Sequence, residues 1–118
     1  MKSYVERPQY EMTNPRADRV KNVSRLSGRS ARLKSHTFRV EGPQGVREAL
    51  KSHATLGPGR IQELYYDPEI LERHPDIAEQ ISELDDKVFL RSASKEVIAA
   101  MSDAQTPQGI LSVCELVT

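Results

Sequence analysis

Apolar residues along the 118-residue chain switch between a helical and an extended spacing. The first helical stretch has apolar residues three apart, with basic side chains between them: Val20, Val23 and Leu26. Such spacing predicts an amphipathic helix. Asn14-Pro15 is a suitable start for it, because Asn accepts backbone N–H groups and Pro lacks a donor that would be unpaired there. Gly28 is expected to weaken or end the helix, and residues 29–35 are expected to form a basic connector or a further helical turn.

Four β-rich segments follow, at 37–40, 61–66, 87–90 and 110–117. Helical patterns separate them: one near 46–52, one that begins at Pro68 and breaks at Pro75, and one capped by Ser92 or Ser94. Strands that alternate with helices predict an α/β domain. We expect a three-layer α/β/α sandwich with a mostly parallel sheet. Residues 1–13 lack periodicity and are expected to form a flexible tail, which leaves 14–118 as the domain.

Composition is typical of a globular domain and excludes some classes. No apolar run approaches the ~20 residues needed to cross a membrane, and the polar N-terminus does not read as a secretory signal. Cys114 is the single cysteine, so no internal disulfide is expected and a reducing, cytoplasmic location is favoured. Its apolar surroundings predict a core position.

The net charge of zero hides a strong asymmetry. Residues 1–60 hold 13 Lys/Arg against 5 Asp/Glu, whereas residues 61–118 hold 4 against 12. Between Arg16 and Arg39 there are eight basic residues and one acid, Asp18. This segment predicts a nucleic-acid footprint. The alternative is a solvated basic helix, and the pI of about 6.8 is not the basic value usual for nucleic-acid binding.

Two motifs about 65 residues apart carry a family resemblance: Phe38-Arg39-Val40-Glu41-Gly42 and Thr106-Pro107-Gln108-Gly109-Ile110. Segments of matching type lie between them: Val46–Leu50, Ile61–Asp67 and Glu96–Ser102. Over residues 23–116 the chain resembles the small substrate-binding domain that precedes the catalytic domain in SpoU-type (TrmH-like) RNA ribose methyltransferases. That resemblance implies a fold similar to the ribosomal kink-turn-binding proteins. In those proteins the loop after the first strand approaches RNA, and Gly42, Pro43, Gln44, Gly45 and Arg47 match it here.

The resemblance and the basic segment together define a set of candidate RNA contacts. Lys and Arg that neutralise phosphates release counterions, and Arg can also stack on exposed bases. The RNA-binding candidates are Arg25, Arg29, Arg32, Lys34, Arg39, Gly42, Gln44, Gly45, Arg47 and Lys51. Kink-turn readers carry an Asn-Glu pair where this chain has Gln44-Gly45, so the chain departs from their pattern.

No catalytic or metal-binding residue is predicted. His36, His53 and His74 lack metal-ligand spacing, and no nucleophile–base arrangement is present. The glycines of 42–45 are similar to the Gly-x-x-Gly loop of KH domains, but they follow a strand, whereas that loop joins two helices.

The resemblance implies the RNA-recognition domain, favouring ribosomal RNA, of an S-adenosylmethionine-dependent RNA 2′-O-ribose methyltransferase. In the family a knotted domain binds the cofactor and forms the homodimer, and it is expected after residue 118. The present segment is then expected to be a non-catalytic monomer without cofactor. Two alternatives remain: a standalone kink-turn-type RNA-binding module, and an α/β domain that contacts proteins through its acidic half.

Overall fold

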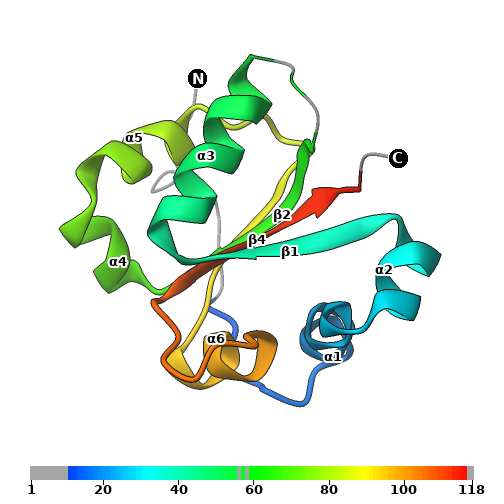
Figure 1. Ribbon diagram of the computed structural model, residues 1–118. Coiled ribbons are helices and arrows are strands. Elements are labelled where there is room, and N and C mark those ends of the chain that lie inside the picture. The colour runs from blue at the N-terminus through cyan, green and yellow to red at the C-terminus, as the bar shows by residue number, and fades with distance from the viewer. Residues whose placement is uncertain (1–10, 56, 58, 117–118) are drawn as a thin grey trace.

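The computed structural model describes residues 11–55, 57 and 59–116. Within them the chain forms a four-stranded sheet with helices on both faces (Figure 1). The strands are β1 (Thr37–Glu41), β2 (Ile61–Tyr66), β3 (Phe89–Ser92) and β4 (Ile110–Glu115). The helices are α1 (Asp18–Ser24), the 3₁₀ turn η2 (Arg25–Ser27), α2 (Arg29–Ser35), α3 (Gly42–Ala54), α4 (Pro68–Arg73), α5 (Pro75–Ser82) and α6 (Lys95–Met101).

The prediction of a mostly parallel sheet is wrong. The strand order is β1-β4-β2-β3, in which β4 pairs antiparallel with both β1 and β2, and only β2 and β3 pair in parallel. The reason is the position at which the chain enters β4. Tyr66, where β2 ends, pairs with Ile110, where β4 begins, so α6 and the following loop do not return the chain to the opposite end of the sheet. The last strand therefore enters the sheet in the reverse direction.

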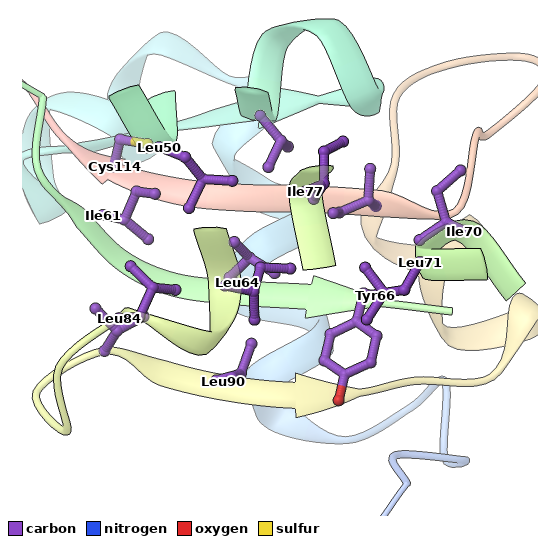
Figure 2. Close-up of a cluster of buried hydrophobic side chains, with 14 residues drawn as sticks. Leu50, Ile61, Leu64, Tyr66, Ile70, Leu71, Ile77, Leu84, Leu90 and Cys114 are labelled. Atoms are coloured by element: carbon purple, nitrogen blue, oxygen red, sulfur yellow. The ribbon is translucent and has the colours of Figure 1, made fainter. Parts of the chain in front are cut away.

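One face of the sheet packs against α3, α4 and α5. Figure 2 shows the side chains of this layer, which come from the sheet (Leu64 and Tyr66 of β2, Leu90 of β3) and from the helices (Leu50 of α3, Ile77 of α5). Cys114 of β4 lies in this layer and is 1% exposed, which confirms its predicted core position. Burial raises the pKa of its thiol, although the bond with Ser112 acts in the opposite direction.

The other face packs against α1, η2 and α6. The predicted apolar stripe of the first helix is confirmed there, because Val20, Val23 and Leu26 are all buried against it. From the sheet, Tyr65 and Val113 contribute to the same cluster. Helix α2 lies on this side of the molecule but has no buried residue. It therefore gains little from apolar burial.

Several predicted boundaries shift. The first helix begins at Asp18, because the Asn14 side chain accepts from the Arg16 N–H (3.0 Å) and forms a turn ahead of the helix. Residues 1–10 of the expected tail lie outside the described residues. Met12 does not behave as a tail: its N–H donates to the Ser92 carbonyl and its carbonyl accepts from the Ser94 N–H, both at 2.9 Å.

Helices α4, α5 and α6 begin at the residues that the sequence predicted. Pro68 and Pro75 open α4 and α5, and Ser94 caps α6 by accepting from the Val97 N–H at 3.2 Å. The third strand begins two residues later than predicted, at Phe89. Within the described residues, no helix is long and apolar enough to span a bilayer.

Candidate nucleic-acid interface

The predicted RNA contacts fall into two groups that the structure holds apart. Arg25, Arg29, Arg32 and Lys34 belong to η2 and α2, before β1, and Gly42, Gln44, Gly45, Arg47 and Lys51 belong to α3, after it. A five-residue strand separates them by about 15 Å along its axis. Figure 1 shows α2 beside one end of β1 and the start of α3 at the other.

Arg39 is the one predicted contact that the structure turns inward. Its side chain is 6% exposed, and its guanidinium donates to the carbonyls of Val23 (2.9 Å) and Met101 (2.8 Å). It also donates to the Ser24 carbonyl, the Ser27 hydroxyl and the Glu41 carboxylate. The carbonyls belong to the last turns of α1 and α6, which lack partners within their helices. The donors of Arg39 thus join two helices to β1, and its predicted phosphate contact stays a prediction.

Glu41 completes this internal network. Its carboxylate pairs with Arg39 (3.0 Å), accepts from the Asp103 N–H (2.9 Å) and binds the Ser102 hydroxyl. Burial acts to raise the pKa of Glu41, but the bonds from Ser102, Asp103 and Arg39 together lower it below its ordinary value of 4.5. Glu41 therefore links the end of β1 to the residues that follow α6.

This lowered pKa predicts how stability responds to acid. A carboxylate with a depressed pKa in the folded state stabilises the fold fully above about pH 4.5, and that contribution declines as the pH falls further. We expect Glu41→Gln to lower the free energy of unfolding at pH 7 and to flatten the loss of stability below pH 5. Denaturant unfolding at pH 7, 5 and 3 measures both effects. Glu72→Gln, an exposed carboxylate on α4, is the matched control and should leave the profile unchanged; parallel profiles for both variants would contradict the prediction.

The predicted loop at 42–45 does not exist as a loop, because α3 begins directly at Gly42. Gly42 has φ of +83°, which reverses the chain at the end of β1, and Pro43 follows in the first turn. A Cβ on Gly42 would lie 2.8 Å from Gln108 Oε1, and one on Gly45 would lie 2.8 Å from Val40 Cγ1. Both glycines therefore serve close packing.

That packing unites the two sequence motifs. Gly42 closes the first and Gln108 belongs to the second, so the motifs meet at one edge of the sheet despite their separation along the chain. A hollow of about 480 Å³ lies beside this contact, between α4, α6 and the loop before β4. Both Lys95 and Arg73 line it and are paired: Lys95 with Asp67 (3.0 Å) and Glu69 (2.8 Å), and Arg73 with Glu69 (4.0 Å). This edge consequently offers little unpaired positive charge.

The remaining candidates on α3 differ from one another. Arg47 is half-buried and forms a salt bridge with Asp76 (2.7 Å), which raises the pKa of Arg47 and lowers that of Asp76. Gln44 is exposed, and its side-chain oxygen accepts from Arg47 at 3.2 Å. Lys51 is exposed, and its side chain has no partner within the described part of the chain. Only Gln44 and Lys51 of this group are thus free to meet a ligand without breaking an ion pair.

Helix α2 is fastened to the domain by polar contacts. Arg32 donates to the carbonyls of Leu26 (2.9 Å) and Ser27 (3.0 Å), which end the 3₁₀ turn, and Ser35 shares a hydrogen bond of 2.7 Å with Thr37. Arg32 is thereby committed to the fold in part, whereas Arg29 and Lys34 point into solvent. Leu33, half exposed, is the large apolar side chain most open to solvent in the described chain.

Unpaired positive charge is concentrated on α1, α2 and the turn before α1. Within the described residues no ion pair or side-chain hydrogen bond engages a group of four exposed cations: Arg16, Lys21, Arg29 and Lys34. Arg25 lies with them and donates to Asn22 at 3.0 Å. In the acidic half, by contrast, Arg73 and Lys95 are paired with carboxylates, and Lys87 is the one exposed cation of the described residues there without a side-chain partner. The basic surface formed by residues 16–34 is therefore the region best suited to a polyanion.

One relevant residue was not among the predicted contacts. Arg19 lies over the ring of Phe89, 3.8 Å from its centroid, and Arg91 lies over the same ring at 4.2 Å. Arg19 also approaches Glu63 at 3.4 Å, and Glu63 accepts from the Tyr65 hydroxyl. The sequence identified Arg19 as a basic residue of the first half. Its neighbours in the chain gave no sign that it would contact Phe89 and Glu63, which lie on strands of the sheet. Burial is the main cause that raises the pKa of Tyr65, with Glu63 adding to it.

The described residues contain no cluster of three or more His, Cys, Asp or Glu side chains that could hold a metal ion. His53 instead has a structural bond: it is buried, and its Nδ1 accepts from the Ile61 N–H at 3.0 Å. The described residues thus define a mixed α/β domain with an external basic helix.

Comparison with known proteins agrees with that class. Residues 17–112 match the family model of the MRM3-like substrate binding domain, and the chain belongs to this family. It is 29% identical over 106 residues to the 23S rRNA (guanosine(2553)-2′-O)-methyltransferase RlmP of Bacillus subtilis. That alignment covers 90% of the chain and 38% of RlmP, so the chain spans well under half of its relative.

Solved structures support the fold. A crystal structure of an RNA 2′-O ribose methyltransferase superposes with a TM-score of 0.72 at 19% identity, covering 92% of this chain and 38% of that one. An rRNA methyltransferase from Sinorhizobium meliloti superposes with a TM-score of 0.62 at 18% identity, covering 92% and 37%. The expected likeness to SpoU-type methyltransferases is confirmed at the level of the domain. The comparisons give no support to the more specific likeness to kink-turn-binding proteins.

Proposed function

We propose that this chain is the domain by which an RNA 2′-O-ribose methyltransferase recognises structured ribosomal RNA. The observation that carries the proposal is the basic surface of residues 16–34, where four exposed cations have no partner in the described chain. Because α2 buries no residue, it can present its side chains to a ligand without disturbing the core. Family membership supports the same role, and the B. subtilis relative is a 23S rRNA enzyme by name.

We propose that methyl transfer itself takes place outside this domain. We propose that S-adenosylmethionine, the catalytic residues and the homodimer contact belong to a further domain of a cytoplasmic enzyme, and that these 118 residues alone are a monomer that holds RNA. The chain covers only 38% of its relative, which leaves room for such a domain. A reading frame that continues past residue 118 into a cofactor-binding domain is the expected genomic observation.

The decisive measurement for recognition is a binding titration of the 118-residue chain with structured 23S rRNA fragments at several salt concentrations. Each phosphate that the protein neutralises contributes about −0.9 to the slope of log K against log salt on duplex. With four to five cations available, we expect a slope of roughly −3.6 to −4.5 and binding that is readily measured at 50 mM salt. Absence of binding at that salt would reject the proposed function and favour the protein-contact alternative.

A further inference from the structure

A groove of about 970 Å³ lies between α1 and α2 and reaches the sheet where β2 begins. One wall comes from α1 and the residue after it, with Asp18, Asn22 and Arg25 at positions i, i+4 and i+7 of one helical face. Ser30 and Lys34, four residues apart on α2, form the other wall. Volumes of roughly 300–1,000 Å³ are typical of sites that enclose a small molecule.

The floor of the groove combines apolar and polar groups. Val23, Leu26 and Val113 form its apolar part, and each of them is at most 6% exposed. The polar part arises from an irregularity in the sheet: Ile61 pairs with Cys114 and Glu63 pairs with Val113, so Gln62 is an extra residue in β2. A bulge of this kind re-aims side chains, and both Gln62 and Glu63 line the groove.

The charged groups that line the groove differ in their pairing. Arg19 is held by Glu63 (3.4 Å) and Asp18 is its neighbour in the chain, so negative charge near Arg19 opposes a phosphate. Lys34 has no partner in the described chain, and Arg25 is bonded only to the neutral side chain of Asn22. The exposed amide of Gln62 also lines the groove and has no partner among the described residues.

This combination matches the parts of a single nucleotide. An unpaired base has flat faces that pack on apolar side chains and edges that hydrogen-bond with amides, and its phosphate attracts a cation. A continuous duplex keeps the faces of its bases stacked on one another and would leave a concave apolar floor unused. We propose that the groove between α1 and α2 holds one unpaired nucleotide of the RNA, with its base against Val23, Leu26 and Val113, its edge toward Gln62 and its phosphate toward Lys34.

The inference rests on the proposed function and adds the class of substrate: an RNA stem with an extruded or single-stranded nucleotide. The probes are four RNA hairpins that carry one bulged A, C, G or U, and the same stem without a bulge. We expect the unmodified chain to bind at least one bulged hairpin about tenfold more tightly than the plain stem, since base contacts of this type contribute on that scale.

Two variants test the groove itself. Gln62→Ala removes the amide, and Ser30→Leu narrows the space from an exposed position on α2. Each should lower affinity for the preferred bulged hairpin about tenfold and change affinity for the plain stem less than twofold. Gln105→Ala is the matched control, because Gln105 is exposed in the loop between α6 and β4 and does not line the groove. Circular dichroism checks that each variant is folded.

The outcomes separate the two proposals. Equal binding of bulged and plain RNA by the unmodified chain, or equal losses on both in the variants, would overturn the nucleotide site and leave RNA recognition intact. Unchanged affinity in Gln62→Ala and Ser30→Leu would overturn it as well. Failure of every RNA to bind at 50 mM salt would instead reject the proposed function.

Discussion

Replacing Arg39 with methionine is expected to lower the free energy of unfolding by about 3–5 kcal/mol. The substitution leaves the carbonyls of Val23 and Met101 without the donor that they share, and leaves the Glu41 carboxylate without its cation. Removal of one partner from a buried network costs the desolvation of those left behind. Urea unfolding followed by circular dichroism measures the loss, which is a large part of the 5–15 kcal/mol usual for a domain.

Two comparisons make this prediction specific. Arg29→Met removes the same chemical group from an exposed position and should change stability by less than about 0.5 kcal/mol. Arg39→Lys keeps the charge but cannot supply the forked set of donors, so it should still destabilise the fold. If Arg39→Met costs no more than Arg29→Met, the network does not hold the helices.

Arg39→Lys also tests the distinction between fold and ligand contact. Under conditions where the variant remains folded, its affinity for RNA and its salt dependence should equal those of the unmodified chain, because Arg39 is 6% exposed. A salt slope that is shallower by about 0.9 would mean that Arg39 does contact a phosphate. The sequence alone predicted that contact.

Reversing the charge of Arg29 and Lys34 together, as Arg29→Glu with Lys34→Glu, is expected to weaken RNA binding by about 100-fold at 0.1 M salt. The salt slope should become shallower by about 2, since two phosphate contacts are lost at roughly 0.9 each. Neither side chain has a partner in the described chain, so the fold should not depend on them. Arg32 is left unchanged because its guanidinium holds the Leu26 and Ser27 carbonyls.

The matched control reverses two cations in the acidic half, Arg73→Glu with Lys87→Glu. Both residues are exposed, and the net charge changes by the same amount. Binding should weaken only a few-fold and the slope should stay nearly constant, because charges beyond about 10 Å are largely screened at this salt. Equal losses in both double variants would show that net charge alone governs affinity, and would contradict the basic surface of residues 16–34 as the footprint.

Much of the domain followed from local pattern. The boundaries of β2, the proline starts of α4 and α5 and the Ser94 cap depend on neighbours within a few residues, where spacing and backbone chemistry act directly. Burial of Val20, Val23 and Leu26 followed from helical spacing for the same reason. The direction of β4 could not be predicted in this way. It depends on the end of the sheet at which the chain arrives after α6, and a short stretch of sequence does not specify that position.

The candidate site, too, was predictable from the sequence only in part. Charge asymmetry was visible in the sequence, and the exposed cations of the basic surface of residues 16–34 lie within the basic segment between Arg16 and Arg39. The roles of individual arginines were not visible, because the carbonyls that bind Arg39 belong to Val23 and Met101, 16 and 62 residues away along the chain. Gln62 became a groove residue only because β2 carries an extra residue opposite β4.

The sequence by itself determined which segments are helices and strands, that the first half is basic, and through its two motifs which family the chain belongs to. These properties depend on residue types and on spacing along the chain. The tertiary structure decided that Arg39 belongs to the fold, that the two motifs meet at Gly42 and Gln108, and that a groove opens between α1 and α2. Each of these depends on groups far apart in the chain, whose contacts are set by packing on the sheet.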